Sequence, residues 1–216
     1  WKGDVYEISL HGEMREAELF GENLLLKREI TTTYPGKQIF VEDTIENQGF
    51  REESAMLLYH FNVGYPLLDE GARIILPTKK VMPRNEAAAP YAEHYDIMEA
   101  PKDNEPEYVF LHELAADEEG NTFAAVINEK LGLGIRLEFN QRELPYFMEW
   151  KSLASGDYVV GLEPANSSVY GRAYHEEKGD LHKIQPFATE KKQLTITILE
   201  GEELQETVKM AEKLVK

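Results

Sequence analysis

The sequence contains no cysteine, and this absence excludes disulfide bonds, zinc sites built from thiolates and catalysis by a thiol nucleophile. It also fits a reducing compartment, so we expect a cytoplasmic protein. No apolar run approaches the roughly 20 residues that a membrane-spanning helix needs. The basic, apolar and small-residue regions of a signal peptide are also missing. We therefore expect no membrane association.

Basic residues are scarce. The chain has 23 lysines and arginines against 40 aspartates and glutamates, which gives a formal net charge of −17. Binding to nucleic acid or to an anionic membrane needs a basic face, because phosphate groups must be neutralised. We therefore expect neither partner. With 216 residues, 42% of them hydrophobic, the chain can bury a core as one large domain or two small ones.

Several motifs of common enzyme classes are absent as well. There is no G-x-S-x-G, no G-x-x-x-x-G-K-S/T and no G-x-G-x-x-G after a strand, so serine hydrolases, nucleotide hydrolases and dinucleotide-binding proteins lack support. His94 near Asp96 and His175 beside Glu176 do not have the two-histidine spacing of a zinc helix. We expect these loop histidines to be solvated, and we predict neither a metal site nor a cofactor.

Alternation of apolar and polar residues with a period of two is the main pattern in the chain. In KKQLTITILEG, for example, Leu194, Ile196 and Ile198 point one way while the threonines between them point the other. Long strands joined by short turns predict an antiparallel all-β protein. The predicted strands lie at residues 23–34, 39–47, 121–130, 132–140, 146–151 and 191–201, with a hairpin between the third and the fourth.

Two segments depart from this pattern. Residues 83–106 are rich in proline, alanine and acids and predict a long irregular loop, of the kind that often forms a lid or wall of a site. The tail, residues 202–216, is the only segment that we predict as a helix, and we expect it to dock on the sheet without a catalytic part. Its apolar face comprises Leu204, Val208, Ala211 and Val215.

Two ionisable residues come at the ends of apolar strands. The stretch DYVVGLEPAN places Glu163 just before a proline, and LLYHFNVGYPLL places His60 in a similar position. A carboxylate and an imidazole at the mouth of a sheet suit proton transfer on a small polar substrate. The structural alternative is that Glu163 caps a turn and His60 is a satisfied core histidine. Because both occur in matching positions, we favour the functional interpretation.

These segments resemble the glutamate and histidine segments of the aldose 1-epimerase (galactose mutarotase) superfamily. The best match is an uncharacterised branch, a domain of unknown function, with the pattern LHG…H-x-N-x-G…W-K…G-L-E-P-x-N. The motifs occur here in the same order between Leu10 and Ile198. The resemblance implies a single domain over residues 1–216 with the galactose mutarotase-like antiparallel β-supersandwich fold. Members carry strands upstream of LHG, so we expect this chain, which starts at Trp1, to lack N-terminal strands.

The resemblance also implies roles for individual residues. Glu163 matches the general base of the family, and His60 matches the histidine that protonates the ring oxygen of the sugar. The better known enzymes have H-x-x-x-N at this point, whereas this chain has H-x-N with Asn62, as in the uncharacterised branch. His11 of the LHG motif matches a ligand of substrate hydroxyls. We expect Asn62 and Asn166, which ends GLEPAN, to bind substrate as well.

Further sugar-binding residues are predicted near these motifs. Arg15 shares a strand face with His11, because alternate residues of a strand point the same way. Trp150 and Lys151 suit a carbohydrate site, since an aromatic ring stacks on a sugar and an amine donates to its hydroxyls; a core position is the alternative for Trp150. Glu107 lies near the position of the substrate-binding aspartate of the family.

The function that we predict is that of an aldose 1-epimerase-type enzyme, which interconverts the anomers of a free sugar or close derivative by acid–base ring opening. The alternative is a carbohydrate-binding protein on the same fold without turnover. A glycosidase would need two carboxylates flanking the scissile bond, and only Glu163 qualifies here. A structural module would have no ionisable cluster at the sheet mouth. We expect a neutral sugar as the partner, because few cations lie near the motifs, and leave a homodimer open.

Overall fold

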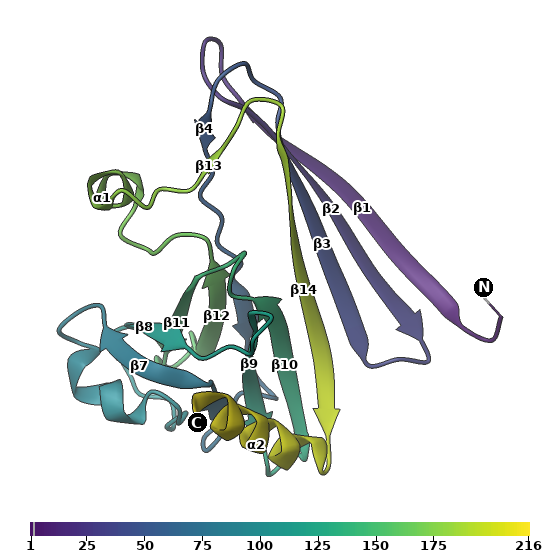
Figure 1. Cartoon of the computed structure of the whole chain (residues 1–216). Coiled ribbons are helices and arrows are strands. Elements are labelled where there is room, and N and C mark those ends of the chain that lie inside the picture. The colour runs from purple at the N-terminus through teal and green to yellow at the C-terminus, as the bar shows by residue number, and fades with distance from the viewer. Residues whose placement is uncertain (2) are drawn as a thin grey trace. The chain divides into compact units, whose positions relative to one another are not determined.

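The chain folds into two compact units, which are coloured along the sequence in Figure 1. The computed structural model describes Trp1 and Gly3–Lys216. Unit 1 comprises Trp1–Leu57 and Val169–Thr197, and unit 2 comprises Leu58–Ser168 and Ile198–Lys216. The single domain over residues 1–216 stays a prediction.

Unit 1 is built on four antiparallel strands in the order β1 (Tyr6–Ala17), β2 (Asn23–Tyr34), β3 (Gln38–Asn47) and β14 (Thr189–Glu200). The first three run side by side through short connections (Figure 1). The bounds of β2, β3 and β14 agree within two residues with the strands predicted from the period of two. β1 is exposed along its whole length, whereas β3 alternates between buried and half-buried positions toward its end.

The core of unit 1 is small and lies where β2 and β3 meet a two-stranded sheet, β4 (Glu53–Ser54) with β13 (Lys183–Ile184). Its buried members are Leu24, Ile45, Ala55 and Ile184.

An ion pair lies on the same sheet. Asp43 on β3 is fully buried and accepts hydrogen bonds of 2.7 and 2.6 Å from the guanidinium of Arg28 on β2. This bidentate pairing offsets the cost of burying the carboxylate.

A short helix in unit 1 corrects two predictions. α1 (Arg172–Lys178) follows Gly171 and ends at Gly179, which has the left-handed backbone conformation that glycine favours at a helix end. The prediction that the tail is the only helix was therefore wrong, because a single helix of two turns is too short to show a periodic pattern. His175 is also not a solvated loop residue: it is buried in α1, with Nδ1 2.7 Å from Asp180 Oδ1.

Unit 2 contains the strands that carry most of the predicted site. A five-stranded antiparallel sheet has the order β5 (Phe61–Val63), β12 (Val159–Ala165), β11 (Tyr146–Ser152), β8 (Tyr108–Leu114) and β7 (Thr78–Pro83). A second set of antiparallel strands has the order β10 (Leu133–Asn140), β9 (Asn121–Asn128) and β6 (Arg73–Ile75). The predicted hairpin between β9 and β10 is confirmed.

The predicted C-terminal helix is confirmed as α2 (Glu203–Val215). Leu204 and Ala211 are buried against apolar side chains of β6 and β9, among them Phe123 and Ile127. Helix and strands thus share one apolar core within unit 2. The predicted loop at 83–106 is irregular except for η1 (Ala89–His94), a 3-10 helix.

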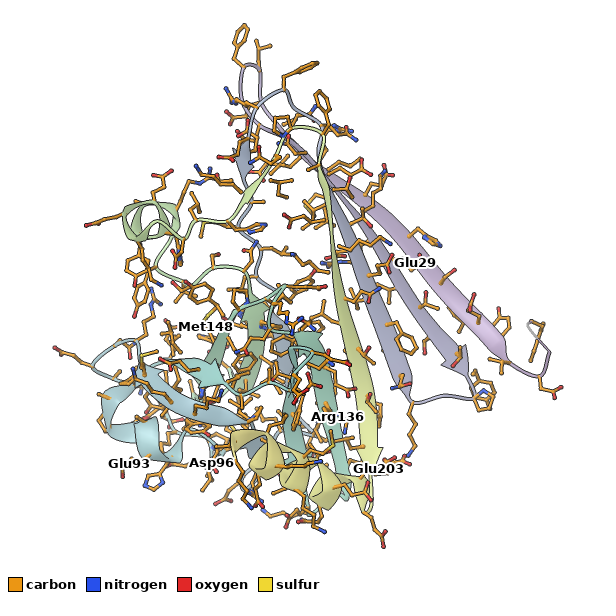
Figure 2. The ribbon with its side chains drawn as sticks, viewed as in Figure 1. Glu29, Glu93, Asp96, Arg136, Met148 and Glu203 are labelled. Atoms are coloured by element: carbon orange, nitrogen blue, oxygen red, sulfur yellow. The ribbon has the colours of Figure 1, made fainter. Side chains whose placement is uncertain are left out.

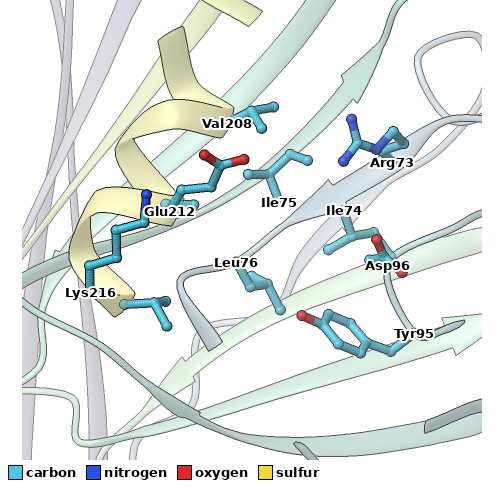
Figure 3. A pocket seen from close by; sticks show the side chains of 11 residues that line it. Arg73, Ile74, Ile75, Leu76, Tyr95, Asp96, Val208, Glu212 and Lys216 are labelled. Atoms are coloured by element: carbon cyan, nitrogen blue, oxygen red, sulfur yellow. The ribbon is translucent and has the colours of Figure 1, made fainter. Parts of the chain in front are cut away.

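A cavity of about 380 Å³ opens between α2 and β6 in unit 2 (Figure 3). Isoleucine and leucine side chains of the 74–76 segment and the tyrosine ring of Tyr95 face it, together with charged side chains of both elements. Among the described residues that line it, none belongs to the predicted site.

No helix in Trp1 and Gly3–Lys216 has the length and the apolar composition needed to cross a membrane.

Candidate active site

Strand register brings His60 and Glu163 together. β5 pairs with β12 in antiparallel register. The bridge between Leu58 and Ala165 continues this register on the N-terminal side of β5. In this register His60 lies directly opposite Glu163. Residues opposite each other on neighbouring strands point to the same face of a sheet. The two side chains that the sequence singles out therefore meet.

Glu163 and His60 are in direct contact. His60 Nε2 lies 2.9 Å from Glu163 Oε1. The glutamate is only 3% exposed, whereas 42% of the His60 side chain is open to solvent. Burial raises the pKa of Glu163 to about 7, and the negative charge of Glu107 adds to this rise. The site thus holds a buried carboxyl group that is partly ionised at neutral pH, beside an imidazole that a solute can reach.

Trp150 and Glu107 extend this pair. The indole ring of Trp150 on β11 meets the His60 ring edge to face, with 5.7 Å between the ring centroids. Its Nε1–H donates a hydrogen bond of 2.7 Å to Glu107 Oε2. Glu107 immediately precedes β8. Four residues from four segments of the chain therefore form one continuous series of contacts. The sequence singled out these residues but did not predict the contacts between them.

Gly161 makes the contact between His60 and Glu163 possible. It lies on β12 opposite Asn62 of β5 and Trp150 of β11. A Cβ atom at this position would lie 2.8 Å from His60 Cε1, closer than real Cβ contacts, and 3.0 Å from Glu163 Oε1, which is tighter than most of them, so the two side chains would have to shift. Sequence reasoning missed this residue. A glycine inside an otherwise apolar strand, as in VVGLEPA, is the available signal, since it often marks a close approach of other atoms.

The remaining predicted residues of unit 2 have different surroundings. Asn62 is exposed and shares the sheet face of Gly161 and Trp150. Asn166 follows β12 and is buried. Met148, labelled in Figure 2, lies opposite Glu163 on β11 and is fully buried, so it forms an apolar floor beside the carboxyl group.

Lys151 does not belong to this face. Adjacent residues of a strand point to opposite sides, so Lys151 projects away from the side on which Trp150 lies. It is 2% exposed, and its ammonium group donates hydrogen bonds to the backbone oxygens of Tyr95 and of Ile97, the latter at 3.2 Å. The prediction that Trp150 and Lys151 serve one sugar site was therefore wrong.

A second group of ionisable residues shares the face of Lys151. The Lys151 ammonium lies 3.5 Å from Glu149, and Glu149 lies 3.4 Å from His112. All three are buried. His112 Nδ1 is also 3.0 Å from the Thr78 hydroxyl. His112 therefore faces the interior of unit 2. Glu149 was not singled out from the sequence, although it lies two residues before Lys151 and shares its strand face.

His11 and Arg15 belong to unit 1. They share one face of β1, as predicted from their spacing. His11 is 67% exposed, with Nε2 3.9 Å from Oε1 of Glu29, which is labelled in Figure 2. Arg15 donates hydrogen bonds of 2.6 and 2.9 Å to the side-chain oxygens of Asn23 and Gln48. Their role as substrate ligands stays a prediction.

Potential metal ligands are scattered. Within Trp1 and Gly3–Lys216, no group of three or more histidine, aspartate or glutamate side chains is arranged to hold a metal ion. The chemistry that the side chains at Glu163 offer by themselves is proton transfer.

Comparison with known proteins places this geometry in a wider context. A family model described as Domain of unknown function (DUF4432) matches residues 1–198. No curated protein matches the sequence. A crystal structure from Klebsiella pneumoniae, of a protein named a "putative aldose 1-epimerase", superposes with a TM-score of 0.93 at 27% identity. The match covers 98% of this chain and 56% of the Klebsiella chain, so this chain spans little more than half of that relative.

More distant structures share the fold. A galactose mutarotase related enzyme from Lactobacillus acidophilus matches with a TM-score of 0.61 and 11% identity, over 89% of this chain and 67% of that one. A galactose mutarotase-like protein from Clostridium acetobutylicum matches with 0.61 and 14%, over 91% and 62%. The predicted galactose mutarotase-like antiparallel fold with a C-terminal helix is thereby confirmed.

Replacing Gly161 by alanine should separate the acid–base pair. The added methyl group cannot occupy the space of the His60 ring, so we expect the imidazole to move away and the 2.9 Å contact with Glu163 to be lost. NMR signals of the His60 ring, or a crystal structure of the variant, measure this. Gly64→Ala is the matched control, because open space surrounds Gly64. An unchanged His60 ring in Gly161→Ala would contradict the steric role.

The raised pKa of Glu163 should make stability depend on pH. Its folded value of about 7 lies above the value of 4.5 for a free side chain, so ionisation destabilises the folded state increasingly from pH 4.5 to 7. Glu163→Gln removes this effect. Relative to the wild type, the variant should gain on the order of 1–2 kcal/mol between pH 5 and pH 8, allowing for screening on the open His60 side.

Urea unfolding at both pH values measures the difference, with Glu113→Gln, an exposed carboxylate on β8, as the control. Parallel stability curves for wild type and Glu163→Gln would mean that Glu163 ionises at its ordinary pKa.

Proposed function

The chain belongs to the family described as Domain of unknown function (DUF4432), and we propose that it interconverts the anomers of a free sugar. The reaction would be acid–base ring opening of the aldose 1-epimerase type. The observation that supports this most is the contact between the buried carboxyl group of Glu163 and the solvent-accessible ring of His60. The names of the structural relatives point the same way.

The reaction needs two proton transfers on neighbouring atoms. Glu163 takes the proton of the anomeric hydroxyl while His60 gives a proton to the ring oxygen. The bond between the anomeric carbon and the ring oxygen breaks, and an open-chain aldehyde forms. After the carbonyl end rotates, the ring hydroxyl returns its proton to His60 and attacks the other face, while Glu163 protonates the carbonyl oxygen. Both oxygens are bonded to the anomeric carbon, so a base and an acid only 2.9 Å apart suit them.

The environment of Glu163 suits a general base. A base is most effective when its pKa lies near the working pH, because it is then both ionised and ready to accept a proton. Burial places the pKa of Glu163 at about 7, far above that of a free glutamate. The carboxyl group is also packed beside the apolar Met148, where water competes little for its proton.

The neighbouring side chains suit the body of a sugar. The partly exposed indole of Trp150 offers a flat apolar surface for the C–H groups of a pyranose, and the exposed amide of Asn62 can both donate to and accept from hydroxyls. Glu163 and Glu107 make this part of unit 2 acidic, which favours a neutral sugar over a phosphorylated one.

Loss of the base should abolish turnover. Glu163→Gln keeps the shape of the side chain but cannot accept the proton, so anomer interconversion should fall on the order of 10²-fold or more, while sugar binding persists. Polarimetry of freshly dissolved D-glucose, D-galactose and D-xylose measures the rate, and calorimetry measures binding. Glu113→Gln should match the wild type.

Full activity in Glu163→Gln would remove Glu163 as the base. A wild-type protein that binds one of these sugars without accelerating its mutarotation would instead be the carbohydrate-binding protein of the alternative interpretation.

The pH dependence of the rate should report both groups. Glu163 must be ionised, so activity should rise through about pH 7 rather than near the ordinary pKa of a carboxyl group. The reaction also needs a protonated general acid, so activity should fall again at higher pH. Rate measurements across the pH range test this, and His60→Gln should lose or shift the alkaline limb only. An alkaline limb that is the same in His60→Gln would exclude His60 as the acid.

A further inference from the structure

Glu107 contacts the Glu163–His60 pair only indirectly, through the side chain of Trp150. It precedes β8 by one residue, and its exposed carboxylate accepts the 2.7 Å hydrogen bond of the Trp150 indole. Trp150 lies opposite Val109, two residues after Glu107, so the indole reaches along the sheet face to meet the carboxylate. The hydrogen bond thus fixes one edge of a large ring that would otherwise turn about its two side-chain bonds.

The same indole contacts the His60 ring. The two rings meet edge to face at 5.7 Å. Gly161, which lies opposite Trp150 and close to the imidazole, offers no side chain. The His60 side chain is 42% exposed, and the indole and Glu163 supply two of the contacts that orient it. The direction in which His60 presents its Nε2 to Glu163 therefore depends on where the indole is held.

We propose that Glu107 is a positioning residue, not a substrate ligand: it holds the Trp150 indole, and the indole holds the His60 ring in contact with Glu163. The proposal assigns to Glu107 a role that differs from the sugar-binding role suggested by the family resemblance. Its kinetic consequences rest on the proposed function, whereas its structural consequences do not.

The charge of Glu107 gives the same residue a second effect. A nearby negative charge disfavours ionisation of a carboxyl group, and Glu107 raises the pKa of Glu163 in addition to burial. This charge effect acts on Glu163 whether or not Glu107 also binds a sugar hydroxyl. A residue that only bound a sugar hydroxyl would leave the Trp150 and His60 rings unchanged in the absence of sugar, so the signals of these two rings distinguish positioning from ligand binding.

Two substitutions separate the hydrogen bond from the charge. Glu107→Gln keeps an oxygen that can accept from the indole but removes the charge, whereas Glu107→Ala removes both. Glu113→Gln, which removes an exposed charge from the other end of β8, is the matched control. The chain has only two tryptophans, so a Trp1→Phe background leaves the indole N–H signal of Trp150 as the only one in the NMR spectrum.

Without sugar, we expect the indole signal and the His60 ring signals to move in Glu107→Ala and to stay close to the wild type in Glu107→Gln. The carboxyl carbon of Glu163, followed by ¹³C NMR, should titrate on the order of half a pH unit lower in both variants and unchanged in Glu113→Gln. Indole and His60 signals that are unchanged in Glu107→Ala would overturn the proposal, whatever the titration of Glu163 shows.

With a sugar that the wild type turns over, Glu107→Ala should lower kcat on the order of tenfold and leave KM within about a factor of two. Glu107→Gln should keep most of kcat and shift the acid limb of the pH profile to lower pH. A raised KM with unchanged kcat would instead make Glu107 a substrate ligand. If no sugar is turned over at all, the proposed function fails, and the sugar-free NMR measurements still decide the role of Glu107.

Discussion

The burial of the Glu163 carboxyl group is the constraint on which the candidate site depends. A carboxylate taken out of water is costly, and burial accordingly raises the pKa of Glu163 to about 7. His60 Nε2 lies 2.9 Å from this carboxyl group, in space that a side chain at Gly161 would crowd. A glycine, a histidine and a glutamate on two neighbouring strands thus form one unit, in which the identity of each residue limits the choice of the other two.

The five-stranded sheet of unit 2 separates two kinds of polar chemistry. On one face, Glu163 meets a histidine that solvent can reach, which suits exchange of protons with a solute. On the other face, Glu149 lies between Lys151 and His112, and all three are buried. Adjacent residues of the same strand, β11, supply both groups. The second group has the character of a structural ion network, in which charges neutralise one another away from solvent.

The sequence predicted the β class, most strands and the terminal helix well, because period-two and 3.6-residue patterns are local properties. It also singled out Glu163 and His60, since each is an ionisable residue in an apolar stretch, although Glu163 lies within β12 and His60 directly precedes β5. It failed where contacts between strands decide. The partners of Glu107 and Trp150 depend on register and on side-chain reach, and the error at Lys151 came from grouping neighbours in the sequence that a strand sends to opposite faces. Likewise, the pKa of Glu163 depends on burial, which strand propensity does not reveal.

The hydrogen bonds of Lys151 to the backbone of Tyr95 and Ile97 have a consequence for the irregular segment 83–106. They attach the middle of that segment to β11. One long loop is thereby divided into two shorter ones, which have fewer accessible conformations. If these hydrogen bonds broke, the buried ammonium of Lys151 would lose its two backbone acceptors. Local opening of the segment and fraying of β11 are therefore linked, and the two should exchange their amide hydrogens as one cooperative unit.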